Sequence, residues 1–468
     1  MQRLIVFHLN DLHARIEQLA RAATVIEQAR DAHPDAAVLF FDAGDSEDNA
    51  FRLSNLTKGV ALHRLLSVIG CDAASIGNAV LPRYGADVLR EQAEAAHYPL
   101  LLANLKLPDG SQIPGTRPAA LLEVREGPRL GLIGVTADLP DIYERYFGLR
   151  PLDALSVIRE LAAQLRQDGA DAVIVLSHMG LAADRALADG LQRTVELIVG
   201  AHSHNLLPEG ERVGDVMIAQ AGQYGEHLGR IDLAWDGERL LIERASVLPL
   251  GEEIPPSPAV LTEIEAIERD AEAFLAVVIG ELAEPLDFAE DRECGVGNLT
   301  ADMLRERMGA EVGLVTAGQA FAGGLPAGPL SRLTLWDVCN SPANPGVVTM
   351  TGTQLLALVR RGLDPEFAQD RPRPMRGQAR GLMHLSGGEV RGGRLLVGGM
   401  PIEAERTYRV AATDWELDTY GGYAEDAWGL QPRYDMPTIV REALEEYLAV
   451  HRPLWGARGR VDGPLLES

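Results

Sequence analysis

The sequence predicts an α/β protein with two domains, a larger layered α/β/α domain followed by a smaller α/β domain. Three observations lead to this prediction. Strand-like and helical patterns alternate through the first 250 of the 468 residues, a proline-rich break follows, and the remainder is richer in Gly, Pro and Arg. The apolar share of 46% is ordinary for a globular protein and is enough to form a sizeable core.

The first domain is expected to cover residues 1–250. Short apolar runs of strand length occur at 4–9, 37–41, 73–76, 100–103, 130–135, 172–176, 195–199, 216–219 and 230–234. Helical patterns lie between several of these runs, at 16–30, 86–96 and 155–167. Strands that alternate with helices predict a layered α/β/α arrangement.

The break between the domains is marked by Pro255, Pro256 and Pro258, which follow two glutamates. Such a cluster is typical of an interdomain linker. The linker and an interdomain helix, expected over 259–278, together fill residues 251–279. The second domain is then expected over 280–468.

The composition excludes several classes of protein. A formal net charge of −25 argues against a nucleic-acid binder, which needs basic surface to displace counterions. No apolar stretch approaches the ~18 residues of a membrane span, so no membrane partner is expected. A phosphorylated small molecule remains compatible with this charge, because bound metal ions supply local positive charge.

Cysteines and the N-terminus bear on the compartment. Cys71, Cys294 and Cys339 lie far apart, which indicates buried thiols and no disulfide framework. The apolar run at 4–9 is too short for the hydrophobic region of a signal peptide, so the prediction is a cytoplasmic protein. The oligomeric state is left open.

Potential metal ligands follow five of the expected strands. They are Asp11, His13, Asp45, Asn78, His178, His202 and His204. Functional sites of α/β sheets assemble at the carboxyl ends of strands, so these residues are expected to meet. Each alone has a structural explanation, such as a turn or a hydrogen-bonded histidine. Together they suit two metal ions, and imidazole with carboxylate favours Mn, Zn, Co or Fe. Asp45, behind Gly44, is expected to bridge the two ions.

The same segments carry a family resemblance. The motifs are Asn10-Asp11-Leu12-His13, Asp42-Ala43-Gly44-Asp45, Gly77-Asn78, Ser177-His178-Met179-Gly180 and Gly200-Ala201-His202-Ser203-His204. They resemble the five blocks of calcineurin-like metallophosphoesterases, and more narrowly the two-domain 5′-nucleotidase branch. Segments 296–302 and 348–352 resemble that branch's C-terminal domain. The resemblance implies a four-layer sandwich for the first domain and a substrate-recognition role for the second.

The resemblance also implies a ligand set and a reaction. One ion would be held by Asp11, His13, Asp45 and His204, and the other by Asp45, Asn78, His178 and His202. The expected activity is hydrolysis of a nucleotide or similar phosphorylated small molecule by metal-activated water, which would place the protein in nucleotide catabolism. The physiological substrate and the choice between monoester and diester do not follow.

The third block departs from the family pattern. Gly-Asn-His-Glu is expected there, but the histidine position is Ala79 and the aspartate that orients it is Pro82. A signal-less subgroup of the family shares such deviations and resembles this chain most. The catalytic residue is therefore unknown, with Arg83 and Tyr84 as candidate substitutes. A surface ion pair or packing explains each of these two residues equally well.

The second domain departs too. The family's Asn-Gly-Gly-Gly-Ile-Arg stretch aligns with residues 317–322, which lack the substrate-binding arginine. Tyr420 and Tyr423 remain as candidates for stacking on a base, although packing is the alternative. Arg376, in the basic segment 370–377, is a candidate for binding an anion, with a solvated loop as the alternative.

Two other functions compete with the enzyme. Because of Ala79, the protein could be a weakly catalytic or non-catalytic binding protein for a phosphate-bearing ligand. Alternatively, the protein has a structural role for the metals, which would only stabilise the first domain, as closed structural sites do.

Overall fold

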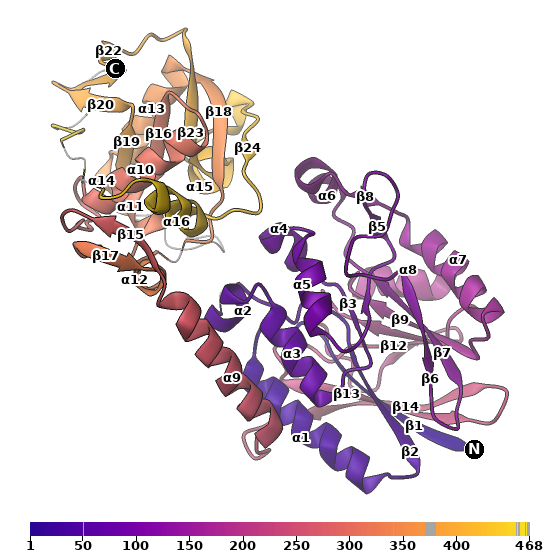
Figure 1. The fold of residues 1–468 in the computed structure, drawn as a ribbon. Helices are drawn as coiled ribbons and strands as arrows, with labels where there is room; N and C mark the ends of the chain where they lie inside the picture. Colours follow the sequence, from indigo (N-terminus) through magenta and orange to yellow (C-terminus); the bar gives the residue numbers. More distant parts are fainter. Residues whose placement is uncertain are drawn as a thin grey trace. The chain divides into compact units, whose positions relative to one another are not determined.

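The structure, a computed structural model, describes residues 1–49, 51–339, 341–369, 381–454, 456, 459–463 and 465. The chain divides into two compact units, Met1–Ala271 and Glu272–Ser468 (Figure 1). The division falls inside helix α9 (Pro258–Leu275). The predicted two-domain α/β class is confirmed, whereas the functional boundaries at 250 and 280 remain a prediction.

The first unit contains two six-stranded sheets. The first sheet has the order β14-β13-β1-β2-β3-β4, with β1 to β4 parallel and β13 and β14 antiparallel to their neighbours. Its strands are β1 (Gln2–Leu9), β2 (Ala36–Asp42), β3 (Ala73–Ser75), β4 (Leu100–Leu101), β13 (His227–Trp235) and β14 (Leu240–Pro249).

The second sheet has the order β11-β12-β10-β9-β7-β6, and the four strands in its middle are parallel. Its strands are β6 (Ala119–Glu123), β7 (Arg129–Val135), β9 (Ala172–Ser177), β10 (Leu197–Gly200), β11 (Glu211–Val213) and β12 (Val216–Ala219). A short pair, β5 (Leu105–Lys106) and β8 (Arg150–Pro151), forms a separate ribbon.

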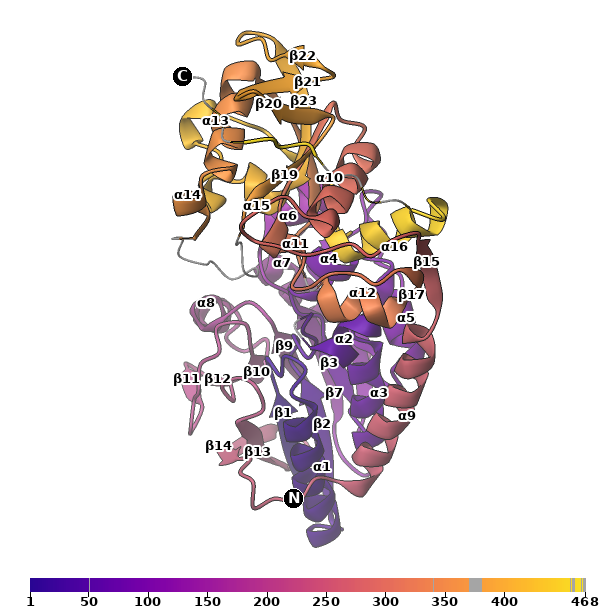
Figure 2. The same cartoon turned by 90° about the vertical axis from the view of Figure 1, so that its left-hand side faces the viewer.

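The two sheets pack face to face between two layers of helices (Figures 1 and 2). Strand β1 shows why its sequence is apolar throughout. Leu4 and Val6 enter the core between the sheets, whereas Ile5 and Phe7 enter the core under the helices. Helices α1 (Ile16–Ala32), α3 (Val60–Ile69) and α5 (Val88–Ala95) cover the first sheet, and α7 (Ala154–Gln167) and α8 (Leu181–Gly190) cover the second. The expected four-layer sandwich is confirmed.

Shorter helices in this unit lie in the loops between the main elements. They are α2 (Arg52–Leu56), α4 (Val80–Tyr84) and α6 (Pro140–Phe147). All nine expected strands are present, with ends that shift by up to three residues. The expected helix over 259–278 is too long, because α9 ends at Leu275 and Val278 already begins strand β15 (Val278–Leu282).

The second unit is built on a five-stranded sheet with the order β19-β16-β23-β18-β24. Helices α10 (Gly295–Arg307) and α16 (Val440–Val450) share a core with one face, and α13 (Gly352–Gly362) shares a core with the other. The strands are β16 (Val312–Thr316), β18 (Pro345–Thr351), β19 (Met383–Ser386), β23 (Thr407–Thr413) and β24 (Arg433–Tyr434).

Smaller elements complete the second unit. The strands are β17 (Gly328–Ser331), which pairs with β15, and β20 (Gly388–Arg391), β21 (Arg394–Val397) and β22 (Met400–Pro401), which form a sheet. The short helices are α11 (Ala317–Ala320), α12 (Arg332–Val338), α14 (Pro365–Gln369), α15 (Asp414–Leu417), η1 (Thr419–Gly421) and η2 (Asp426–Trp428).

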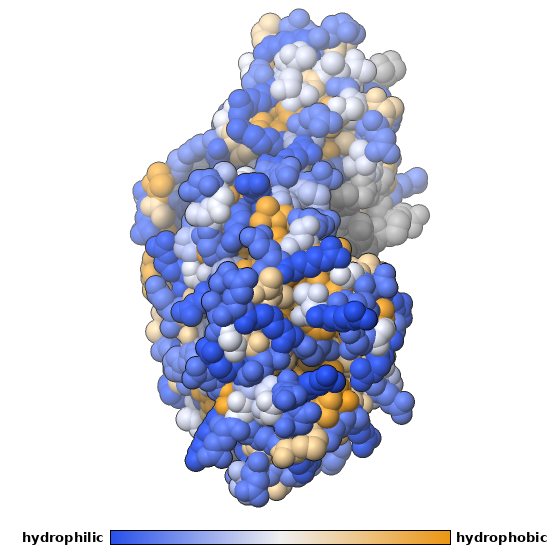
Figure 3. Space-filling view, turned by 90° about the vertical axis from the view of Figure 1, so that its right-hand side faces the viewer, coloured by the Kyte–Doolittle hydropathy of each residue, from blue (hydrophilic) through white to orange (hydrophobic). Residues whose placement is uncertain are grey.

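Two expectations from composition can be compared with the structure. The three cysteines are buried free thiols, as predicted. Within the described part of the chain, no helix combines the length and apolar character needed to cross a bilayer. On the face drawn in Figure 3, hydrophilic side chains predominate and hydrophobic ones lie in small groups.

Candidate metal centre

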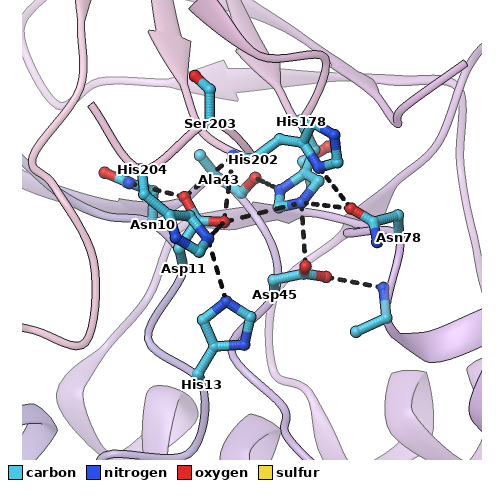
Figure 4. A network of polar contacts seen from close by, with 12 residues as sticks. Asn10, Asp11, His13, Ala43, Asp45, Asn78, His178, His202, Ser203 and His204 are labelled. Atoms are coloured by element: carbon cyan, nitrogen blue, oxygen red, sulfur yellow. Dashed lines mark hydrogen bonds and ion pairs between the residues drawn. The ribbon is translucent and has the colours of Figure 1, made fainter. Parts of the chain in front are cut away.

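The seven candidate ligands lie together where strands of both sheets end (Figure 4). Asp11 and His13 follow β1, Asp45 follows β2 and Asn78 follows β3 in the first sheet. His178 follows β9, and His202 and His204 follow β10 in the second. The convergence that the sequence predicts is therefore present in the structure.

The loops that carry these residues have an unusual backbone. Five of the seven candidates have positive φ angles, namely Asp11 (50°), His13 (47°), Asp45 (52°), His202 (71°) and His204 (56°). A non-glycine residue in this region costs roughly 1–3 kcal/mol, and such residues cluster at functional sites. The packed sheets on either side hold the loops in this conformation, aided by backbone bonds such as Asp11 N–H to the Gly44 carbonyl at 3.0 Å.

Two glycines allow the loops to approach each other. Gly44 has a φ of 101°, and a Cβ there would lie 2.8 Å from both the Gly77 nitrogen and the Nδ1 atom of His178. A Cβ on Gly77 would lie 1.9 Å from the Oδ1 atom of Asp45. Neither position can accept a side chain without displacing a candidate ligand or its loop.

One group of ligand atoms is formed by Asp11, His13 and His204. The Nε2 atom of His204 lies 3.3 Å from the Oδ1 atom of Asp11 and 3.3 Å from the Nε2 atom of His13. Two imidazole nitrogens that face each other beside a buried carboxylate are a geometry that one divalent cation would satisfy.

A second group is formed by Asp11, Asp45 and His178. The Nε2 atom of His178 lies 3.2 Å from the Oδ2 atom of Asp45 and 3.9 Å from the Oδ1 atom of Asp11. The amide oxygen of Asn78 lies 3.2 Å from this Nε2 atom and 2.6 Å from the Nδ1 atom of His202. All four residues of the second predicted ligand set therefore adjoin one another.

The aspartate shared by the two groups is Asp11, whereas the sequence predicts that Asp45 bridges. Both oxygens of Asp11 lie within 3.1 Å of the His202 N–H, and Asn10 donates to one of them. One oxygen of Asp45 accepts the N–H of Ala79 at 2.9 Å, which turns that oxygen away from His13 and His204 (Figure 4). The bridging role of Asp45 stays a prediction.

The electrostatics of the site favour a bound cation. Burial disfavours the charged form of His178, but the carboxylates of Asp45 and Asp11 outweigh it and raise the pKa of His178 to about 9. Burial likewise opposes ionisation of Asp45, yet His178 and the Ala79 N–H lower its pKa to about 2. A potential that stabilises an imidazolium also attracts a divalent ion, and imidazole, carboxylate and amide donors suit one.

Sequence reasoning missed two supporting residues. The Nδ2 atom of Asn10 donates to Asp11 at 2.9 Å and to the Gly222 carbonyl at 2.6 Å, which fixes the carboxylate. Tyr224 has a φ of 57°, its N–H donates to the Asp11 carbonyl at 2.8 Å, and its ring centroid lies 5.6 Å from that of His13. Tyr224 belongs to a segment that follows the expected strand 216–219, so the strand-end rule could have found it.

The candidate substitutes for the missing histidine lie on or beside helix α4. Ala79 contributes its backbone N–H to the network. Arg83 is 8% exposed, donates to the side chain of Asn55 at 2.8 Å and lies over the ring of Tyr84. A role for Arg83 or Tyr84 in catalysis stays a prediction.

The candidates in the second domain have different outcomes. Tyr423 is 1% exposed, and its ring packs against Phe367, with centroids 5.3 Å apart, so packing is favoured over base stacking. Segment 317–322 forms helix α11 and the residues after it. Arg376, with the whole segment 370–377, lies outside the described residues, and the same holds for the side chain of Tyr420.

Comparisons with known proteins agree with this geometry. The model of the 5′-nucleotidase C-terminal domain matches residues 278–425. The uncharacterized metallophosphoesterase YunD of Bacillus subtilis is 29% identical over 96% of this chain and 99% of its own length. A 5′-nucleotidase of Diplobatis ommata is 26% identical over 64% of this chain, which spans 59% of that relative.

Solved structures support the fold. The 5′-nucleotidase precursor of Thermus thermophilus superposes with a TM-score of 0.52 at 23% identity, over 99% of this chain and 100% of that one. The NAD nucleotidase of Haemophilus influenzae gives a TM-score of 0.60 at 13% identity, over 98% of each chain.

Fold, site and relatives define the class of a metal-dependent phosphoesterase. More narrowly, the chain resembles calcineurin-like, 5′-nucleotidase-like two-domain proteins, and these relatives support a hydrolase that acts on phosphoric esters.

Proposed function

We propose that the protein is a dinuclear-metal phosphoesterase that hydrolyses a nucleotide or a related phosphorylated small molecule. The observation that carries this proposal is the convergence of Asp11, His13, Asp45, Asn78, His178, His202 and His204 from two sheets. Relatives named 5′-nucleotidase support the substrate class.

The residues of the proposed site have different roles. Asp11 and Asp45 supply the negative charge that offsets the repulsion between two cations, and the histidines and Asn78 complete the two ligand sets. The Ala43 carbonyl accepts from Nδ1 of His178 at 2.9 Å, which leaves Nε2 free to face the metal side. When bound, two divalent ions (Mn, Zn, Co or Fe) would neutralise phosphoryl charge and activate the attacking water.

A weakly catalytic or non-catalytic binding protein is the second candidate. Ala79 favours it, because an alanine side chain has no hydrogen bond or proton to give to the reacting phosphate. In that case the metal centre would hold a phosphate-bearing ligand.

The remaining parts of the proposal concern organisation. Residues 1–250 would carry the metal centre, and residues 280–468 would recognise the substrate. The protein would act in the cytoplasm on a small molecule, without a nucleic-acid or membrane partner.

A phosphatase screen tests the proposal. The full chain, dialysed and then supplied with Mn, Co or Zn, is assayed against nucleotides, sugar phosphates and phosphodiesters, and its metal content is measured. We expect about two ions per chain and turnover of at least one ester. Two bound ions without any turnover would favour the binding protein. No bound metal, and no gain in thermal stability with Mn or Zn, would exclude both.

A further inference from the structure

Arg15 stands out among the arginines around the metal centre. It precedes helix α1, two residues after His13, and is half-buried. Its guanidinium carbon lies over the ring of Phe51, at 4.2 Å from the centroid, and over the ring of Tyr224, at 4.6 Å. Two aromatic contacts hold the guanidinium in place.

The donors of this guanidinium are not used by the protein. Within the described part of the chain, they meet no hydrogen-bond acceptor and no carboxylate. Neighbouring arginines on α1 behave differently. Arg21 donates to the Ile254 carbonyl at 2.6 Å, and Arg30 to the Ile69 carbonyl at 2.6 Å. Arg15 therefore combines a fixed position with free donors, which is the condition for binding an anion in a fork geometry.

Tyr224 links Arg15 to the metal centre. The Tyr224 ring that carries the guanidinium also packs against the rings of His13 and His204, at centroid distances of 5.6 and 6.2 Å. Its backbone is tied to Asp11 by a hydrogen bond of 2.8 Å. A single ring thus separates the guanidinium from the first group of metal ligands.

The charge of the region makes a fixed cation useful. The chain carries a net charge of −25, and Asp48 lies beside His13, with its Oδ2 atom 3.9 Å from Nδ1. A phosphate dianion that enters this acidic region is repelled except where positive charge is placed. Arg15 supplies such charge on the side of His13 and His204.

We propose that Arg15 binds the phosphate group of the substrate beside the metal ligands, with Phe51 and Tyr224 holding its guanidinium in position. This inference rests on the proposed function, because it assigns the ligand of the same site. Arg15 would contact phosphoryl oxygens directly, whereas Phe51 and Tyr224 are positioning residues.

Calorimetric titration of the Mn-loaded full chain with inorganic phosphate tests the assignment. Loss of charge-assisted hydrogen bonds in Arg15→Gln should weaken phosphate binding roughly 10- to 100-fold. Arg15→Lys keeps the positive charge but not the forked guanidinium, so its phosphate affinity should lie between those of the wild type and Arg15→Gln. Metal content should stay at the wild-type value in both variants. Arg21→Gln, which removes a positive charge from the helix that follows Arg15, should bind phosphate as the wild type does.

Two further measurements separate this role from a structural one. Phe51→Leu keeps Arg15 but removes one ring, so phosphate binding should weaken by less than in Arg15→Gln. Thermal melting identifies any variant that has lost its fold. If Arg15→Gln does not fold, the phosphate affinities of Arg15→Lys and Phe51→Leu test the assignment.

Unchanged phosphate affinity in Arg15→Gln at full metal content would overturn the assignment, as would an equal loss in Arg21→Gln. A wild-type protein that binds Mn and phosphate but hydrolyses no ester would refute the hydrolase and leave Arg15 testable by binding. A wild-type protein that binds Mn but no phosphate would overturn the role of Arg15.

Discussion

The two units differ in where they tolerate a strained backbone. All ten described non-glycine residues with positive φ lie in the first unit, and seven of them surround the metal centre: Asp11, His13, Ala14, Asp45, His202, His204 and Tyr224. In the described part of the second unit, positive φ angles occur at glycines, where they cost little. Strain is thus concentrated at the candidate metal ligands, as is common at functional sites.

The two units also differ in the candidate side chains that they contain. The first unit brings the seven predicted ligands together at one site, whereas the second unit lacks the expected arginine in 317–322 and buries Tyr423. We therefore expect changes at the metal centre to abolish function, and changes at Tyr423 to affect mainly stability. Variants of the two units test this contrast.

Replacing either aspartate that could bridge the two ions should have the largest effect. Asp11→Asn and Asp45→Asn should each reduce hydrolysis of an aryl phosphate by roughly 10³-fold and lower the metal content, because each removes charge that offsets two cations. His13→Ala should cost less, because it removes no carboxylate charge, and His13 belongs to one group only. Elemental analysis and initial rates measure both effects. A larger loss in His13→Ala would show that neither aspartate bridges, and the order of the two aspartate variants identifies the bridge.

Removing the support of a ligand should have a smaller effect. Asn10→Ala deletes the amide that holds Asp11 against the Gly222 carbonyl. Loss of such a supporting bond typically lowers metal affinity by roughly 10–100-fold. Competition with a fluorescent chelator measures the affinity for Mn. A variant with wild-type affinity would show that the strained backbone alone positions Asp11.

Restoring the missing histidine should raise activity modestly. Ala79→His adds a donor near the reacting phosphate, but Pro82 leaves it without an orienting aspartate. We expect a rise in kcat of roughly tenfold, about 1.4 kcal/mol of barrier, with unchanged metal content. An unchanged rate at full metal occupancy would indicate that another group already fills this role, and Arg83→Gln would then be the next variant to assay.

The smallest effect is expected in the second unit. Tyr423→Phe removes the hydroxyl that lies 3.3 Å from the Thr316 hydroxyl inside the core. The free energy of unfolding should fall by about 1 kcal/mol, and KM should not change, because the ring is buried. Denaturant unfolding and steady-state kinetics measure the two quantities. A raised KM at unchanged stability would restore Tyr423 as a substrate-binding residue.

The sequence by itself determined the layered α/β class, the nine expected strands of the first unit and which seven candidate ligands meet at one site. It did so because buried parallel strands are continuous apolar runs, and because the residues directly after them must meet at one edge of a sheet. Helix α9 is shorter than predicted. Its apolar pattern continues through Val277 into β15, with no glycine or proline to mark the end of the helix.

Only the tertiary structure decided which ligands share a group and which residues support them. Asp11 rather than Asp45 joins both groups because of left-handed turns and of hydrogen bonds from His202 and Ala79, none of which is local in sequence. The contact of Arg15 with Phe51 and Tyr224 joins three segments far apart along the chain. Distances between such segments depend on how two sheets pack, and hydrophobic periodicity along one strand carries no information about that packing.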